Sequence, residues 1–399
     1  MKVMQFDVST AFLYGAVDEE IYMHQPVGFE DDTNRVCRLN RSLYGLKQAS
    51  RCWNQKFDKF MVSLGFMQSK EDPCVYIRHH KVIVALYVDD GLVVSTNQEE
   101  LDNFLDELRS KFKIVAKELN YFLGLEISQS KNGDITVGQS AFVDKLLERF
   151  NMVGCKPVST PIEKLTSSAS GKENVTFPYR SAVGALLYLA RGSRFDIAFA
   201  VSVLSRSLEN PTVEDVGRVK RVFRYLAGTK DLKLVYRSEP ESRVMSCYSD
   251  ADFAGCQTTL RSTTGVVIMF ADAAVCWLSR RQQLVSDSTC EAETIAANAA
   301  SKEIVWLARL LKELINLSAI PVLQIDNQAA KRLSENPEFH FRTKHIQRKY
   351  LFIRDRIKKK MLEVCHVESD LQLADIFTKP LPRIRLLKLR HMLGLKSNI

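Results

Sequence analysis

Residues 82–94 read VIVALYVDDGLVV, and this stretch decides the fold of the N-terminal part of the chain. Two runs of β-branched and aliphatic residues, Val82–Val88 and Leu92–Val94, flank the short turn Asp89-Asp90-Gly91. Such runs around an Asp/Gly turn predict a β-hairpin. Both carboxylates of the turn can lie on one side of the hairpin tip, and carboxylate oxygens are the ligands that Mg²⁺ prefers. Taken alone, Asp-Asp-Gly is also a common structural turn.

The composition is that of an ordinary globular protein. The chain has 399 residues, of which 46% are hydrophobic and 26% are charged, and its formal net charge is +9. This length predicts roughly two to four domains, and the modest basic excess is compatible with a polyanionic partner without demonstrating one. The nine cysteines include no Cys-x-x-Cys pair, which disfavours a zinc knuckle and a disulfide framework and predicts free thiols. We expect no signal peptide and no membrane partner, because no apolar run is long enough.

The pattern of apolar residues predicts a multidomain chain of mixed α+β and α/β class. A β-rich block covers 1–115, and a second block, 116–165, has a strand at Tyr121–Ile127 and a helix at Phe142–Phe150. A helical connection covers 166–240, beginning with a Ser/Gly-rich linker. Residues 244–380 form an α/β domain, and 381–399 a basic tail. Within the α/β domain we expect strands near 245–249, 265–270, 275–278, 322–325 and 361–367, and helices near 291–314, 345–359 and 371–377.

Four acidic residues of the α/β domain fit a second metal site. Asp250 and Asp326 end strands, Glu291 opens the long helix and Asp375 lies late in the domain. Each has a structural alternative, such as a turn, a helix cap or a solvated surface position, and Asp252 competes with Asp250 for the first position. Their order is nevertheless the arrangement of the ribonuclease H superfamily, whose fold brings such carboxylates around one metal pair.

Longer motifs along the whole chain resemble the Pol polyprotein of copia-type (Pseudoviridae) long-terminal-repeat retrotransposons. The motifs are FDVSTAFLYG at 6–15, QPVGF at 25–29, SLYGLKQAS at 42–50, YVDD at 87–90, YFLGLE at 121–126, YSDADFAG at 248–255, EAE at 291–293, DNQ at 326–328, RTKHI at 342–346 and LADIFTKPL at 373–381. They occur in the family's order, so the resemblance covers essentially the whole sequence.

For the first block, the resemblance implies a reverse transcriptase palm that is followed by a thumb. Asp7, Asp89 and Asp90 would be catalytic and hold two Mg²⁺ or Mn²⁺ ions. Phe12 would be the steric gate against a ribose 2′-hydroxyl, and Tyr87 and Gln48 would contribute to the nucleotide site; Phe12 and Tyr87 have an alternative as core aromatics. The implied partners are deoxynucleoside triphosphates and a template–primer. Because the family's fingers segment precedes the first motif, we expect a partial, N-terminally truncated palm and an impaired polymerase.

For the last block, the resemblance implies a ribonuclease H domain that cuts the RNA strand of RNA–DNA hybrids. Asp250, Glu291, Asp326 and Asp375 would be catalytic and hold two Mg²⁺ or Mn²⁺ ions, and substrate would be contacted by Arg342, Lys344 and His345. Other Pol or Gag products are possible partners, and the expected location is a cytoplasmic virus-like particle with nuclear entry. The alternative is a relic that binds nucleic acid without catalysis.

Overall fold

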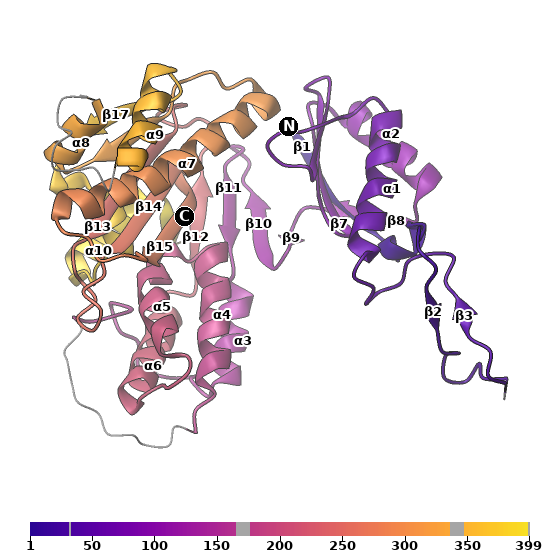
Figure 1. Ribbon diagram of the computed structural model, residues 1–399, viewed down its shortest axis with the longest axis horizontal. Helices are drawn as coiled ribbons and strands as arrows, with labels where there is room; N and C mark the ends of the chain where they lie inside the picture. Colours follow the sequence, from indigo (N-terminus) through magenta and orange to yellow (C-terminus); the bar gives the residue numbers. More distant parts are fainter. Residues whose placement is uncertain (32, 165–175, 336–346, 398–399) are drawn as a thin grey trace. The chain divides into compact units, whose positions relative to one another are not determined.

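The computed structural model describes residues 1–31, 33–164, 176–335 and 347–397 (Figure 1). The chain divides into two compact units, which are described separately. The first consists of Met1–Leu119 with Arg309–Leu317, and the second of Asn120–Ala308 with Ser318–Ile399. None of the helices in the described ranges is long and apolar enough to cross a membrane.

The first unit contains a six-stranded antiparallel sheet in the order β4-β5-β6-β7-β1-β8. Its strands are β1 (Lys2–Val8), β4 (Met67–Gln68), β5 (Val75–Arg78), β6 (Val82–Tyr87), β7 (Asp90–Ser95) and β8 (Ile114–Glu118). The helices α1 (Ala49–Ser63) and α2 (Gln98–Lys111) share one hydrophobic core with the sheet, and a short pair, β2 (Tyr22–Met23) and β3 (Cys37–Arg38), stands apart from it.

The predicted hairpin at 82–94 is confirmed as β6 and β7. Side chains alternate across a sheet, and Val82, Val84 and Leu86 are the buried members of β6. Gly91 of β7 is aligned with Phe6 of β1. A Cβ atom at Gly91 would lie 2.0 Å from Cζ of Phe6, so the glycine is needed for this ring to pack across the sheet.

The second unit contains a five-stranded sheet in the order β18-β12-β11-β10-β9. Its strands are β9 (Tyr121–Phe122), β10 (Leu125–Gln129), β11 (Ile135–Gly138), β12 (Leu232–Tyr236) and β18 (Leu395–Ser397). The single strand predicted over Tyr121–Ile127 is therefore wrong. Leu123 and Gly124 have φ angles of 48° and 82°, and two consecutive positive φ angles reverse the chain between β9 and β10.

Helices pack beside this sheet in one large core. They are α3 (Ser140–Arg149), α4 (Tyr179–Gly192), the 3₁₀ helix η2 (Phe195–Ile197), α5 (Ala198–Leu204) and α6 (Val213–Ala227). A second 3₁₀ helix, η3 (Ser205–Ser207), follows α5 and has no buried residue. The predicted helix at Phe142–Phe150 and the helices of the connection are confirmed. The prediction of a basic tail at 381–399 is wrong, because this segment contains α10 (Arg383–Met392) and β18. Leu386 and Leu389 are buried in the core, and Arg390 donates a hydrogen bond to the Tyr225 hydroxyl at 3.1 Å.

The same unit contains a second five-stranded sheet in the order β15-β14-β13-β16-β17. The strands are β13 (Ser246–Asp252), β14 (Thr263–Phe270), β15 (Ala273–Arg281), β16 (Val322–Ile325) and β17 (Glu363–His366), and the helices are α7 (Thr289–Ile315), α8 (Gln328–Glu335), α9 (Gln347–Lys358) and the 3₁₀ helix η6 (Leu373–Phe377). The element order predicted for 244–380 agrees with the structure except for α8, which follows β16 and was not predicted. β14 is antiparallel to its neighbours, whereas β13, β16 and β17 are parallel. Their carboxyl ends therefore meet at one edge, where ligands bind in open α/β sheets.

Candidate functional sites

Asp250 and Asp326 lie at the carboxyl ends of two adjacent parallel strands. Ser249 of β13 is aligned with Ile325 of β16, so the residues that follow each of them lie side by side. The side chain of Asp250 is nearly fully buried, and that of Asp326 is partly buried. These two predicted ligands are therefore brought together by the sheet.

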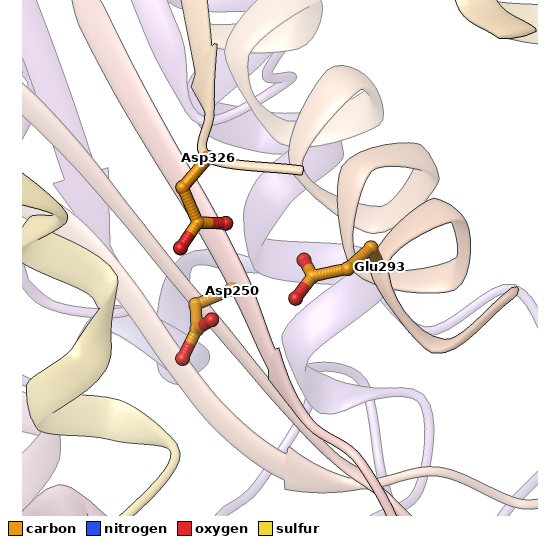
Figure 2. Close-up of side chains that lie close together, drawn as sticks. All are labelled: Asp250, Glu293 and Asp326. Atoms are coloured by element: carbon orange, nitrogen blue, oxygen red, sulfur yellow. The ribbon is translucent and has the colours of Figure 1, made fainter. Parts of the chain in front are cut away.

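Glu293 of α7 completes the group (Figure 2). In the described part of the chain, the one group of three or more potential ligand side chains is Asp250, Glu293 and Asp326, with ligand atoms within 4.8 Å of one another. The Oε1 atom of Glu293 accepts a hydrogen bond from the backbone N–H of Ala251 at 3.3 Å, and its Oε2 atom is buried with no hydrogen-bond partner.

The prediction that Glu291 is the helix ligand is therefore corrected to Glu293. The carboxylate of Glu291 accepts a hydrogen bond from the backbone N–H of Asp287 at 2.8 Å, just before α7 begins. Residues of an α-helix are spaced by about 100°, so Glu293 lies about 20° from the direction of the buried Ile304, whereas Glu291 lies about 140° away. Counting back from the apolar stripe of the helix would have identified Glu293 from the sequence.

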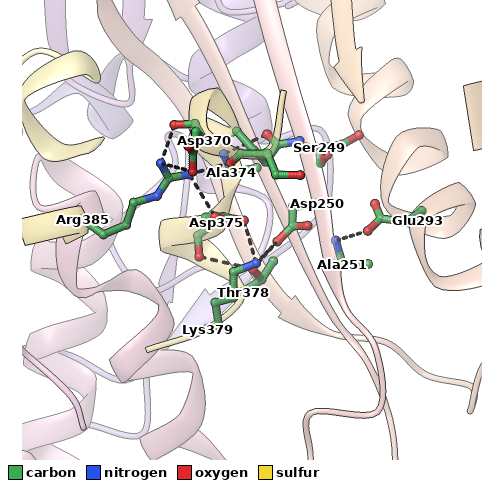
Figure 3. A network of polar contacts seen from close by, with 12 residues as sticks. Ser249, Asp250, Ala251, Glu293, Asp370, Ala374, Asp375, Thr378, Lys379 and Arg385 are labelled. Carbon is green, nitrogen blue, oxygen red and sulfur yellow. Dashed lines mark hydrogen bonds and ion pairs between the residues drawn. The ribbon is translucent and has the colours of Figure 1, made fainter. Parts of the chain in front are cut away.

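Asp375 lies next to this group but is held by two cations (Figure 3). Lys379 Nζ lies 2.7 Å from Asp375 Oδ1 and 3.7 Å from Asp250 Oδ2, and Arg385 Nη2 lies 3.2 Å from Asp375 Oδ2. The ammonium group of Lys379 thus bridges two of the predicted metal ligands. The sequence analysis did not identify Lys379, although it is part of the quoted motif at 373–381.

A close approach of η6 to the sheet positions Asp375. Gly265 of β14 is aligned with Asp250, and a Cβ atom there would lie 2.6 Å from Thr378 Cγ2 and 2.8 Å from the Ala374 carbonyl oxygen. The buried Gln372 donates from Nε2 to the Ser249 carbonyl oxygen at 2.9 Å, which ties the start of η6 to β13.

Burial and mutual repulsion change the acidity of these groups. Burial, together with the charges of Asp250 and Asp326, raises the pKa of Glu293 to about 9. The pKa of Asp250 rises to about 6, mainly through burial and against the opposing effect of Lys379. Burial and the charge of Asp375 also raise the pKa of Asp326. Burial would lower the pKa of Lys379, but the surrounding carboxylates raise it.

The donor set fits a divalent cation. It consists only of carboxylate oxygens from a sheet edge and a helix, the combination that hard cations such as Mg²⁺ prefer. The unpartnered, buried Oε2 of Glu293 supplies a free donor in the middle of the group. A cation at this position would stabilise the charged carboxylates, whose pKa values are raised first by burial and then by repulsion between neighbouring carboxylates.

Other predicted residues lie outside the group. Asp252 is partly buried, and burial raises its pKa, but it is not one of the three clustered carboxylates. The predicted substrate contacts Arg342, Lys344 and His345 lie outside the described residues. His366, which the sequence analysis did not consider, ends β17, and its Nε2 atom lies 3.1 Å from the Asp326 carbonyl oxygen.

In the first unit, Asp7 and the Asp89–Asp90 tip converge as predicted. Asp7 of β1 is directly opposite Asp90 of β7, and the N–H of Val8 donates to the Asp89 carbonyl oxygen at 2.8 Å. Burial, followed by the charges of Asp89 and Asp7, raises the pKa of Asp90. The clustering is looser than in the second unit, because the three carboxylates do not form a group within 4.8 Å.

The tip is held in a strained conformation. Val88 has a φ of 59°, which is unfavourable for a β-branched residue. The buried indole of Trp53 donates from Nε1 to the Val88 carbonyl oxygen at 2.5 Å. Strain of this kind persists where surrounding structure enforces it and is concentrated at functional sites.

Aromatic residues surround this first site. The half-buried ring of Phe12 lies 4.7 Å from that of Tyr44, whose pKa is raised by burial and by the charges of Asp89 and Asp7. Tyr44 was therefore missed as a site residue, although it lies in the quoted motif at 42–50. Tyr87 is 62% exposed, which makes its alternative as a core aromatic wrong. Gln48 donates from Nε2 to Glu19 Oε2 at 3.1 Å.

Comparisons with known proteins identify the family of the chain. Residues 1–164 match the family model described as reverse transcriptase (RNA-dependent DNA polymerase). Over 308 residues the chain is 34% identical to the transposon Ty5-1 protein of Saccharomyces cerevisiae, and the match covers 75% of this chain and 100% of that protein. The chain belongs to the copia-type retrotransposon Pol family. It is also 40% identical over 418 residues to the Pol polyprotein from transposon TNT 1-94 of Nicotiana tabacum.

That second match covers 100% of this chain and 31% of the polyprotein, so the chain spans about a third of this curated relative. Among solved structures, the foamy viral protease-reverse transcriptase in complex with RNA/DNA hybrid is similar with a TM-score of 0.54 and 11% identity, covering 92% of this chain and 44% of that chain. This likeness shows the fold, and the second unit contains the mixed α/β sheet that was predicted for 244–380.

Proposed function

We propose that the second unit hydrolyses the RNA strand of RNA–DNA hybrids with two Mg²⁺ or Mn²⁺ ions. The observation that carries this proposal is the buried group formed by Asp250, Glu293 and Asp326. The similar foamy viral protein was solved in complex with an RNA/DNA hybrid, which supports the choice of substrate.

In this proposal, the three clustered carboxylates bind cations, and Asp375 is oriented beside them by Lys379 and Arg385. Divalent cations bound there supply an activated water and stabilise charge on the leaving oxygen. The imidazole of His366 contacts the backbone carbonyl oxygen of Asp326 and so helps to hold this end of β16 in place. Because burial excludes water around the carboxylates, their interaction with charge is stronger than on an exposed surface.

The test is a hybrid-cleavage assay on the full chain with a labelled RNA strand. Asp326→Asn removes a clustered carboxylate with little change of shape and should abolish cleavage. The matched control is Asp252→Asn, which changes an acidic residue outside the group and should retain cleavage. Equal cleavage by wild type and Asp326→Asn would contradict the proposal. Binding of the hybrid without metal-dependent cleavage would favour the non-catalytic relic.

We also propose that the first unit serves template-directed DNA synthesis from deoxynucleoside triphosphates. The pairing of Asp7 with Asp90 at a strained hairpin tip and the nearby rings of Phe12 and Tyr44 support this role. A rigid carboxylate set would hold divalent cations, which would neutralise the charge that develops during phosphoryl transfer. The experiment is primer extension on an RNA template by the full chain. Extension should be lost in Asp89→Asn, and equal extension by both proteins, or extension by neither, would contradict the proposal.

A further inference from the structure

A cavity of about 630 Å³ lies in the second unit, along the edge strand β15. Its walls come from α4, α5, η3 and β15, so it lies between the connection helices and the ribonuclease H-like sheet. Four arginines line it, and no acidic residue does; they are Arg191, Arg206, Arg280 and Arg281.

Arg206 and Arg281 are two cations without a carboxylate in direct contact. Across the residues that the structure describes, no carboxylate oxygen lies within ion-pair distance of either guanidinium group, although the charge of Asp252 acts on Arg206 from farther away. Arg206 Nη2 lies 3.4 Å from Thr263 Oγ1, its buried Nε has no hydrogen-bond partner, and Arg281 Nη1 lies 3.7 Å from Cys256 Sγ. Burial and the charge of Arg281 lower the pKa of Arg206, and Cys256 and Asp252 only partly oppose this shift. Partly buried guanidinium groups in such a position are stabilised when an anion binds.

The register of the sheet relates this pair to the carboxylate site. Asp252 of β13 is aligned with Thr263 of β14, which is aligned with Arg281 of β15. Asp250 lies two residues before Asp252, so its side chain is on the same face of the sheet as that of Arg281. The backbones of Asp250 and Arg281 are separated by two strand spacings across the sheet and two residues along a strand, which together give about 12 Å. This distance corresponds to about three to four nucleotide steps at 3.4 Å each. A single strand of nucleic acid can therefore reach both places.

We propose that Arg206 and Arg281 bind a backbone phosphate of a nucleic-acid strand at a position about three to four nucleotides away from the phosphodiester that lies at the carboxylate site. This inference rests on the proposed ribonuclease function and names how its substrate is held. The planar guanidinium groups match the geometry of phosphate oxygens and donate charge-assisted hydrogen bonds. The exposed Arg191 and Arg280 at the rim add positive charge at the entrance.

The test measures hybrid binding without cleavage, by fluorescence anisotropy of a labelled RNA–DNA hybrid with EDTA over a range of salt concentrations. The double variant Arg206→Gln/Arg281→Gln should bind about ten-fold or more weakly, as expected for loss of hydrogen bonds between charged groups. Its plot of log K against log[salt] should be shallower by about one unit for each phosphate that the variant no longer binds. Arg243→Gln is the matched control, because Arg243 is exposed and lies outside the cavity, and it should bind as wild type.

The melting temperature separates binding from a structural role. Since the two cations repel each other, the double variant should melt at or above the wild-type temperature. A lower melting temperature with an unchanged salt slope would overturn the inference. If inorganic phosphate stabilised the wild type but the variant bound the hybrid as tightly as the wild type, the arginines would form only a site for small anions. This result would also overturn the inference. If the wild type binds no hybrid, the proposed function fails as well, whereas tight binding that the variant retains refutes only the arginine site.

Discussion

The variant Glu293→Gln gives the sharpest test of which glutamate belongs to the metal site. The amide keeps the shape of the side chain and can still accept the hydrogen bond of the Ala251 N–H. In the metal-free protein the pKa of Glu293 is about 9, against an ordinary value of 4.5. At pH 8, which is about 3.5 units above the ordinary pKa of a glutamate, the carboxylate must therefore take up a proton on folding. At about 1.4 kcal/mol for each unit, this destabilises the folded state by as much as about 5 kcal/mol.

Glutamine removes this effect, because its side chain does not ionise in either state. In EDTA at pH 8 the variant should melt higher than the wild type, by up to about 10 °C at about 2 °C for each kcal/mol. The sign follows from a raised pKa in the folded state: the penalty is absent below pH 4.5, where both states are protonated, and it grows as the pH rises toward 9. The advantage of the variant should therefore disappear near pH 4.5.

Added Mg²⁺ or Mn²⁺ should reverse the order of the melting temperatures of the wild type and Glu293→Gln. A ligand that binds only the folded state stabilises it by about 2.7 kcal/mol at one hundred times its Kd, so the wild type should gain stability and Glu293→Gln should gain little. Glu291→Gln is the matched control, since it changes the same residue type two positions away and should keep the full response to metal. Differential scanning fluorimetry measures all three proteins. A normal metal response in Glu293→Gln together with a lost response in Glu291→Gln would refute the assignment.

Three further predictions concern single side chains. Lys379→Met should lower the melting temperature in EDTA, because it leaves the carboxylates without their internal cation, and it should increase the stabilisation by Mg²⁺. If the difference between the melting temperatures in EDTA and in Mg²⁺ stayed as in the wild type, the bridging role of Lys379 would be contradicted. Gly265→Ala should destabilise the protein by about 1–3 kcal/mol in urea unfolding, because the new methyl group meets the Ala374 carbonyl oxygen; a neutral effect would argue against the close approach of η6. Val88→Gly should raise the free energy of unfolding by about 1 kcal/mol by relieving the positive φ, and destabilisation would contradict the strain at the hairpin tip.

The elements with a strong local pattern could be predicted from the sequence. The hairpin at 82–94 alternates with a period of two, and the strand at Val322–Ile325 agrees with the structure at both ends. The segment after residue 381 was misread as a tail because its basic residues conceal the buried Leu386 and Leu389. Its partner strand, β12, lies more than 150 residues earlier in the chain, and no local pattern reports such a distant pairing.

The candidate sites were predicted in outline and missed in detail. Asp250 and Asp326 were found because strand ends are recognisable. Glu291 was chosen because it opens the long helix, and a capping pattern at the start of the helix was its structural alternative. That pattern describes a real contact, since Glu291 accepts a backbone hydrogen bond at the helix start, but a cap does not point into the site. The bridging position of Lys379 depends on how η6 packs over Gly265, which only the folded chain defines.

The most direct measurement is anomalous scattering from crystals of the full chain soaked with Mn²⁺. We predict a peak within coordination distance of the carboxylates of Asp250, Glu293 and Asp326, and its loss in crystals of Asp326→Asn. A Mn²⁺ peak that contacts Glu291 instead, or crystals that show no peak near these three carboxylates, would contradict the proposed metal site.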